Sequence, residues 1–130
     1  MKRLYALRGA AQCLNEAGDI GIQVCALYDE LLRANDLAEE DIVSLVFSVT
    51  ADLDAKNPCA ALRRTGRAAD LALFAVQEAS AQGSLPRTIR TLIHCYMEEG
   101  SNPRHIYRNG AEVLRPDRSY SNSSPRVTSG

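Results

Sequence analysis

The chain has 130 residues, of which 15 are Lys or Arg and 16 are Asp or Glu, so its formal net charge is -1. This length is typical of one domain with a hydrophobic core of its own. The balanced charge and the 5% of aromatic residues argue against a nucleic-acid-binding protein, which needs a broad basic surface and rings on which bases stack.

The cysteines and the N-terminus exclude further classes of protein. The four cysteines, Cys13, Cys25, Cys59 and Cys95, are scattered and form no C-x-x-C pair, so we expect reduced thiols and no zinc site. The apolar run of the N-terminus is interrupted at Arg8, too early for a signal peptide, and no segment approaches membrane-spanning length. We therefore expect a soluble, cytoplasmic protein that has no metal site and contacts no membrane.

The first part of the chain carries signals of two strands and a helix. Residues 3–10 alternate between apolar and polar side chains, which predicts a strand with Arg8 at its end. Between 19 and 35, apolar residues recur at helical spacing, and Asp19 can cap the N-terminus of that helix. The run "IVSLVFSVT" at 42–50 is rich in β-branched residues and predicts an interior strand.

A short helix is predicted at 57–66, "NPCAALRRTG". Asn57 can cap its N-terminus, and Pro58 suits the first helical position. Gly66 can end the helix in the left-handed backbone conformation. The sequence therefore carries signals for both the start and the end of this helix.

Three further strands are predicted in the second half. The run "LALFAVQ" at 71–77 is continuously apolar and is typical of a strand buried on both faces. Residues 88–97 alternate, with Ile89, Thr91, Ile93 and Cys95 on one face and Arg90 on the other. A loop then leads to "HIY" at 105–107, and a last short strand is expected at 111–115.

This order of elements predicts an α+β fold, a five-stranded mixed sheet with helices on one face. Because two helices cover only one face well, we expect the other face to pack against further copies of the chain. Residues 1–117 are predicted to form the single domain. Residues 118–130 are polar and Ser-rich, which is typical of a flexible tail.

Five polar or charged residues lie in or beside the predicted strands: Arg8, Glu78, Arg90, Tyr107 and Arg115. Each alone has a structural explanation, as a solvated strand end, a loop carboxylate, a rim charge or a core ring with its hydroxyl in water. Arg90 lies in the middle of a strand, where an ion pair with Glu78 would account for it. If the five converge instead, they would form a pocket for a small molecule with several negative charges.

The sequence shows no nucleophile paired with a histidine, no phosphate-binding glycine loop and no cluster of metal ligands. His94 and His105 each stand alone. A charged pocket without these groups suits simple binding, or a reaction that is accelerated by positioning and electrostatics.

From Arg3 to about Asp117 the chain resembles the AroH-type, monofunctional chorismate mutases. No single motif is specific, but their order and spacing together are. The matching segments are "LRGA" at 7–10, "SVTADLDA" at 48–55, "NPCAALR" at 57–63, "QE" at 77–78, "GSLPRTIR" at 83–90, "RHIY" at 104–107 and "VLRPD" at 113–117.

The resemblance implies a homotrimeric pseudo-α/β-barrel with active sites between subunits. It implies the isomerisation of chorismate to prephenate in aromatic amino acid biosynthesis, without a cofactor or a covalent intermediate. Chorismate is a dicarboxylate, in keeping with the anionic ligand suggested by the charged residues.

The resemblance also implies roles for individual residues. Arg90 would face the ether oxygen, Arg8 and Tyr107 would hold the enolpyruvyl carboxylate, and Glu78 would accept a hydrogen bond from the ring hydroxyl. Arg63 and Arg115 would attract and enclose the substrate from the periphery, Arg63 from across the subunit interface. The remaining substrate contacts are expected from Asn57, Phe74, Ala75 and Leu114.

The chain departs from the family pattern at three positions. Ala75 replaces a common Cys or Ser, Asn57 replaces a frequent aromatic residue, and Ala60 replaces a frequent basic one. These changes predict an active enzyme that binds its substrate more weakly.

Two other functions remain open at this stage. One is a trimeric imine or enamine hydrolase on a similar fold, and the other is a non-catalytic, anion-binding regulatory module. Chorismate turnover distinguishes both from a chorismate mutase.

Overall fold

The structure is a computed structural model that describes residues 1–114. The expected tail at 118–130 and the candidate residue Arg115 lie outside the described residues. The helices and strands are β1 (Lys2–Gln12), α1 (Ala17–Ala34), β2 (Ile42–Val49), α2 (Pro58–Arg64), β3 (Leu73–Gln77), β4 (Thr88–Glu98) and β5 (Ile106–Arg108), with short 3-10 helices η1 (Glu39–Asp41) and η2 (Ala111–Leu114).

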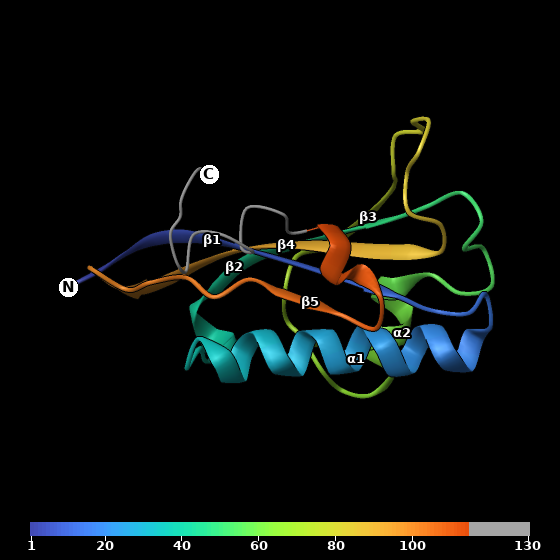
Figure 1. Cartoon of the computed structure of the whole chain (residues 1–130). Helices are drawn as coiled ribbons and strands as arrows, with labels where there is room; N and C mark the ends of the chain where they lie inside the picture. Colours follow the sequence, from blue (N-terminus) through green and yellow to red (C-terminus); the bar gives the residue numbers. More distant parts are fainter. Residues whose placement is uncertain (115–130) are drawn as a thin grey trace.

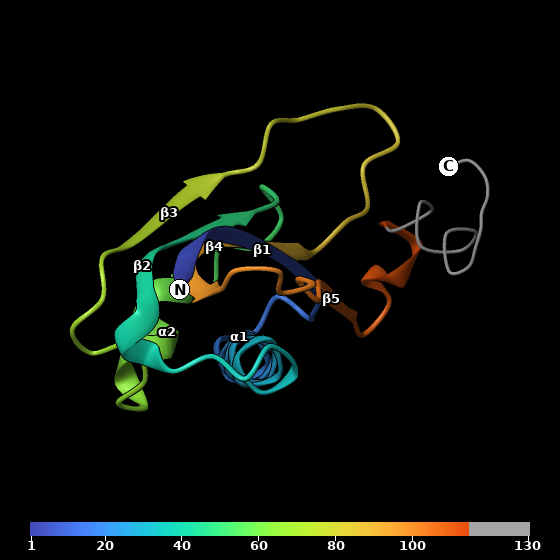
Figure 2. The same ribbon diagram turned by 90° about the vertical axis from the view of Figure 1, so that its left-hand side faces the viewer.

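One mixed sheet of five strands organises the chain, in the order β3-β2-β4-β1-β5. The central strand β4 runs antiparallel to both of its neighbours, β1 and β2, whereas β3 and β5 pair in parallel at the two edges. Helices α1 and α2 lie on the same side of this sheet, as Figure 1 shows, and Figure 2 shows the strands in their order across it. The predicted α+β class and the one-sided cover of helices are confirmed.

The hydrophobic core lies between the helices and the sheet. Val24 and Leu27 of α1 are fully buried there with Leu7, Ile93 and Phe47 from the strands. The alternation predicted for β4 is also confirmed, because Ile89, Ile93 and Cys95 are buried while Arg90 on the other face is partly exposed.

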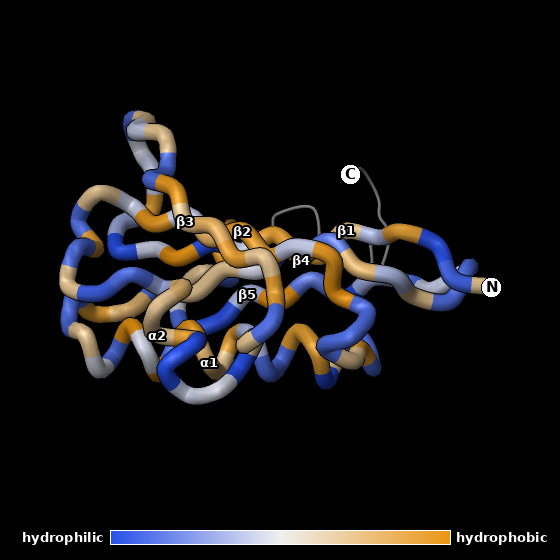
Figure 3. The backbone as a smooth tube through the Cα atoms, turned by 180° about the vertical axis from the view of Figure 1, so that it is seen from behind, coloured by the Kyte–Doolittle hydropathy of each residue, from blue (hydrophilic) through white to orange (hydrophobic). Residues whose placement is uncertain are grey.

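The side of the sheet opposite α1 and α2 is called the open face here. Large apolar side chains on it are exposed in the single chain, including Leu4, Tyr96, Phe74 and Val76. Figure 3 shows the hydrophobic segments of β2 and β3 along this part of the sheet. An exposed apolar area of this kind is typical of a surface that another molecule covers.

Strand β3 corrects the prediction of a strand buried on both faces. Among residues 1–114 it pairs with β2 alone and is therefore an edge strand of the sheet described here. Phe74 is 65% exposed and Val76 42% exposed. A continuous apolar run does not distinguish a strand inside a sheet from an edge strand with an uncovered face.

Strand β1 is longer than predicted, so Arg8 lies within the strand and not at its end. Pairing with β4 continues without interruption from Lys2 to Gln12, past the glycine where the apolar alternation ends. Arg8 therefore lies on a stretch of strand that pairs with β4 both before and after it.

Two smaller predictions are wrong. Asp19 lies inside the first turn of α1, and its carboxylate accepts a hydrogen bond from the backbone N–H of Leu14 at 2.7 Å, outside the helix. The expected strand at 111–115 is the 3-10 helix η2, so the fifth strand of the sheet is β5. In contrast, α2 begins as predicted, with the Asn57 side chain accepting from the N–H of Cys59 at 2.8 Å, and Gly66 has a φ of +88°.

The four cysteines are free thiols, as expected. In the part of the chain that the structure describes, no helix is both long and apolar enough to cross a membrane.

Candidate active site

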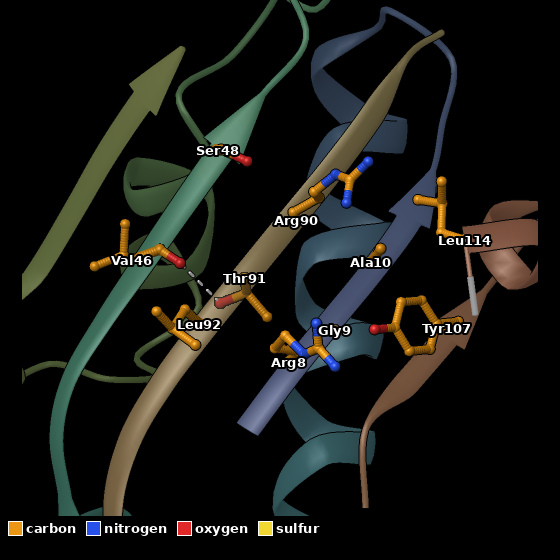
Figure 4. Close-up of a pocket in the computed structure, with 10 residues that line it drawn as sticks. All are labelled: Arg8, Gly9, Ala10, Val46, Ser48, Arg90, Thr91, Leu92, Tyr107 and Leu114. Carbon is orange, nitrogen blue, oxygen red and sulfur yellow. Dashed lines mark hydrogen bonds between the residues drawn. The ribbon is translucent and has the colours of Figure 1, made fainter. Parts of the chain in front are cut away.

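A cavity of about 250 Å³ lies on the open face, over β1, β2, β4 and β5. Figure 4 shows the side chains around it. Its lining residues are Arg8, Gly9, Ala10, Val46, Ser48, Arg90, Thr91, Leu92, Tyr107 and Leu114. Four residues predicted to bind or transform a substrate therefore meet here: Arg8, Arg90, Tyr107 and Leu114.

The register of the sheet sets the centre of the cavity. Ser48 pairs with Arg90, Arg90 pairs with Ala10, and Ala10 pairs with Tyr107, so these four residues form one row across β2, β4, β1 and β5. Side chains in such a row point to the same face. The small methyl group of Ala10 between the arginine and the tyrosine leaves room for a ligand.

Glu78 joins this row from the end of β3. Its backbone N–H donates to the carbonyl oxygen of Val49 at 2.7 Å, which extends the β2–β3 pairing by one residue. Its Oε2 atom lies 3.0 Å from Nε of Arg90, and its Oε1 atom accepts a hydrogen bond from Oγ of Ser48 at 2.7 Å. Glu78 does not line the cavity but touches two residues that do.

The contact between Arg90 and Glu78 has the distance of an ion pair but not the alignment of a hydrogen bond, since the buried Nε of Arg90 has no hydrogen-bond partner among residues 1–114. The two side chains are 41% and 21% exposed. At this exposure water screens the pair, so it contributes little to the stability of the fold. Its effect is to orient the two groups.

Arg8 and Tyr107 face each other across the cavity. In Figure 4 the hydroxyl of Tyr107 is directed towards the guanidinium of Arg8. The backbone N–H of Arg8 donates to Nδ1 of His105 at 3.0 Å, which ties β1 to the segment that leads into β5. The two side chains are thus held on adjacent, cross-linked strands.

Gly9 allows β5 and α1 to approach β1 closely. A Cβ atom at this position would lie 3.0 Å from a methyl carbon of both Leu27 and Leu31, and 3.2 Å from the carbonyl oxygen of Ile106. Such contacts are too short for a side chain to be accepted without displacement of its neighbours. The glycine therefore sets the distance at which β5 places Tyr107.

Four other predicted residues lie away from the cavity. On α2, Arg63 donates from Nη2 to the carbonyl oxygen of Leu71 at 3.2 Å, and Asn57 caps the helix. On β3, Phe74 is exposed, while Ala75 alternates with it and lies on the opposite face. None of the four lines the cavity of this chain.

Sequence reasoning did not single out Ser48. The available signal was its place in the run "IVSLVFSVT", where alternation puts a hydroxyl among apolar residues on one face of a strand. Which residue it would meet depends on the register with β4.

The cavity offers guanidinium, phenol and hydroxyl groups beside one carboxylate, a set suited to anions. Among residues 1–114, no three or more His, Cys, Asp or Glu side chains are grouped so that they could hold a metal ion.

Comparison with known proteins identifies the family. The family model described as chorismate mutase type I matches residues 4–118. The chain belongs to this family. The resemblance predicted from the sequence is therefore confirmed.

Individual members of the type I chorismate mutases agree with this assignment. The chain is similar to a chorismate mutase from Clostridium thermocellum, with a TM-score of 0.78 and 37% identity over 85% of this chain and 99% of that one. It is 34% identical over 90 residues to chorismate mutase AroH of Thermus thermophilus, which covers 68% of this chain and 73% of that protein. It is 29% identical over 92 residues to chorismate mutase AroH of Bacillus subtilis, which covers 70% and 72%.

Proposed function

We propose that this chain is a chorismate mutase, an isomerase that rearranges chorismate to prephenate in aromatic amino acid biosynthesis in the cytoplasm. In this reaction the ether C–O bond breaks while a C–C bond forms in the same molecule, so no atom is gained or lost and no cofactor is required. The observation that carries the proposal is the row of Arg90, Ala10 and Tyr107 in the cavity of a chain that belongs to this family.

Arg90 would stabilise the transition state. Negative charge grows on the ether oxygen as its bond to carbon breaks, and a cation already fixed beside that oxygen stabilises the transition state more than the ground state. Arg90 is suited to this role because β4 is hydrogen-bonded on both sides. Its contact with Glu78 is made by Nε, which leaves the terminal nitrogens Nη1 and Nη2 for a ligand.

Arg8 and Tyr107 would bind the enolpyruvyl carboxylate. A guanidinium and a phenol hydroxyl on adjacent strands can both donate to one carboxylate. Holding that carboxylate over the ring would favour the compact, reactive conformer over the extended one. This restriction would lower the activation barrier without any covalent step.

Glu78 would accept a hydrogen bond from the ring hydroxyl of chorismate. Its Oε1 atom already accepts from Ser48, so the carboxylate has a defined orientation before the substrate arrives. Ala75 has no side-chain donor or acceptor, so the neighbouring residue on β3 adds no further hydrogen bond.

We further infer that the chain forms a homotrimer with active sites between neighbouring copies. The open cavity of about 250 Å³ is smaller than the range of about 300–1,000 Å³ that is typical of complete small-molecule sites. The exposed Phe74 and Val76 on the open face would be covered by a neighbouring copy. Arg63 of that copy would complete the cavity. Its charge would bring the net positive charge of the site closer in magnitude to the two negative charges of chorismate.

The decisive test incubates the purified full-length protein with chorismate and follows the loss of chorismate and the appearance of prephenate. We expect turnover that depends on Arg90. Hydrolysis of an imine or enamine substrate, without turnover of chorismate, would indicate a hydrolase instead. Calorimetric binding of a bicyclic dicarboxylate transition-state mimic, without any turnover of chorismate, would indicate a binding module.

A further inference from the structure

Ser48 is the one hydroxyl-bearing side chain of β2 that touches a charged residue of the candidate site. Its Oγ atom donates to Oε1 of Glu78 at 2.7 Å, a distance typical of a hydrogen bond between a hydroxyl and an ionised carboxylate. It also lines the cavity and pairs with Arg90 across the sheet. Ser48 therefore lies between the two groups that would approach opposite parts of the substrate.

The contact fixes the Glu78 carboxylate at both of its oxygens. Oε1 is held by the Ser48 hydroxyl, while Oε2 lies 3.0 Å from Nε of Arg90. Without the hydroxyl, the carboxylate would keep the ion pair at Oε2 but could rotate about that contact, because the pair lacks hydrogen-bond alignment. The hydroxyl of Ser48 is thus the main positional restraint on Glu78.

The same restraint extends to Arg90. Its Nε faces the oxygen of Glu78 that Ser48 does not hold, so a rotation of the carboxylate would move the negative charge that the guanidinium faces. The opposite edge of the guanidinium, with Nη1 and Nη2, remains available for a ligand.

We propose that Ser48 is a positioning residue of the active site, which orients the Glu78 carboxylate and through it the Arg90 guanidinium. This inference rests on the proposed chorismate mutase activity. It adds to that activity a residue that acts through Glu78 and needs no contact with the substrate.

The first experiment compares matched substitutions at position 48. Ser48→Thr keeps the hydroxyl. Ser48→Val has the shape of the threonine variant but no hydroxyl, and both residues are suited to a strand. We expect kcat/KM with chorismate to fall by about tenfold to a hundredfold in Ser48→Val and in Ser48→Ala, and to be largely retained in Ser48→Thr. Equal activity of the Thr and Val variants would overturn the proposal.

Ser44→Ala is the matched control. Ser44 lies on the same face of the same strand, and its hydroxyl contacts Nδ1 of His94 at 3.0 Å, away from the cavity. We expect this variant to keep the activity of the unmodified protein. If Ser44→Ala and Ser48→Ala lose activity to the same degree, the effect comes from the strand in general and the proposal fails.

The second experiment is a double-mutant cycle between Ser48→Ala and Glu78→Ala. It is measured as the calorimetric affinity for the bicyclic dicarboxylate mimic, which can be determined even where turnover is lost. If Ser48 acts through Glu78, its removal weakens binding about tenfold or more in the unmodified protein and has little effect once Glu78 is alanine. An equal loss in both backgrounds would assign Ser48 a direct contact with the ligand and overturn the proposal.

These outcomes are distinct from failure of the proposed function. If the unmodified protein does not convert chorismate, the proposed function fails, and the binding cycle still decides whether Ser48 acts through Glu78. If the unmodified protein is active and the Thr and Val variants are alike, only the role of Ser48 fails.

Discussion

The Nε atom of Arg90 lies 3.0 Å from Oε2 of Glu78, so two side chains expected to face different parts of the substrate contact each other across β2. An ion pair between them was one of the structural explanations that the sequence left open, and the structure contains it. It does not compete with a catalytic role. It occupies only the Nε edge of the guanidinium, and the edge with Nη1 and Nη2 remains available.

Replacing Arg90 with lysine should reduce turnover strongly. Arg90→Lys keeps the positive charge but loses the planar fork and its reach, so we expect kcat to fall by about 10² to 10³-fold or more. Steady-state kinetics with chorismate measures the effect. Arg33→Lys is the control, because Arg33 is exposed on α1, on the side of the sheet opposite the cavity (Figure 2). A near-normal rate for Arg90→Lys would contradict the role proposed for Arg90.

The proposed trimer predicts a specific effect of a charge on β3. Phe74→Asp would place a carboxylate on an apolar surface that is expected to be buried between copies, so assembly should be lost. Light scattering after gel filtration should give a mass about three times 14.2 kDa for the unmodified protein and a lower mass for the variant.

Ile22→Asp provides the control for this experiment. Ile22 is 64% exposed but lies on α1, on the other side of the sheet. Its variant should keep the mass of the unmodified protein. A single-chain mass for the unmodified protein would refute the trimer.

The cap of α2 predicts a moderate loss of stability. Asn57→Ala removes the side-chain acceptor for the N–H of Cys59, which should lower the free energy of unfolding by about 1 kcal/mol. Asn57→Asp keeps an acceptor and should retain most of that stability. Thermal denaturation compares the two variants.

If both variants also raise the KM for chorismate equally, the amide of Asn57 additionally contacts the substrate, as the family resemblance implies.

Stability should decline in alkaline solution because of Tyr28. The ring is 2% exposed and its hydroxyl donates to Oε2 of Glu39 at 2.5 Å. Burial, followed by this hydrogen bond, raises the pKa of Tyr28 above its usual value. A raised pKa in the folded state means that the stabilisation is complete below the unfolded pKa of about 10 and decreases as the pH rises beyond it.

The variant Tyr28→Phe tests this dependence. Near neutral pH it should be less stable by about 1–3 kcal/mol, because Glu39 then loses a hydrogen bond to its carboxylate. Above pH 10 it should show a shallower decline than the unmodified protein in urea denaturation. Parallel curves for the two proteins across the alkaline range would contradict the prediction.

The domain boundary predicted at residue 117 leads to a truncation experiment. Removal of residues 118–130 should leave the melting temperature nearly unchanged, because this polar segment has almost nothing to bury. Substrate capture should weaken, which would raise the KM for chorismate more than it lowers kcat. A large fall in melting temperature would show that the domain extends beyond residue 117.

The sequence predicted the elements of the fold better than their environment. Local signals were sufficient for α2, where a cap, a proline and a terminal glycine follow one another, and for the alternation around Arg90. They were insufficient for β3, because an apolar run looks the same in the middle of a sheet and at its edge. They also failed for the residues of η2, since four residues are too few to distinguish a strand from a 3-10 turn.

For the candidate site, the sequence indicated which residue types are involved, but it did not indicate that they lie close together in the fold. Residues 8, 90 and 107 converge only because β1 pairs with both β4 and β5 in a particular register, and such pairing joins segments far apart in the chain. The family resemblance supplied that relation where local patterns could not. Ser48 was missed because its partner Glu78 is defined by the register of β2 with β3 and β4.

Gly9 has a consequence for any effort to redesign this protein. A residue without a side chain, and therefore without chemistry of its own, determines how far the tyrosine-bearing edge lies from the rest of the pocket. Randomised libraries intended to alter substrate preference should vary the neighbouring lining positions and keep this one constant. A methyl group added here would require the side chains of Leu27 and Leu31 and the backbone of β5 at Ile106 to move away from it.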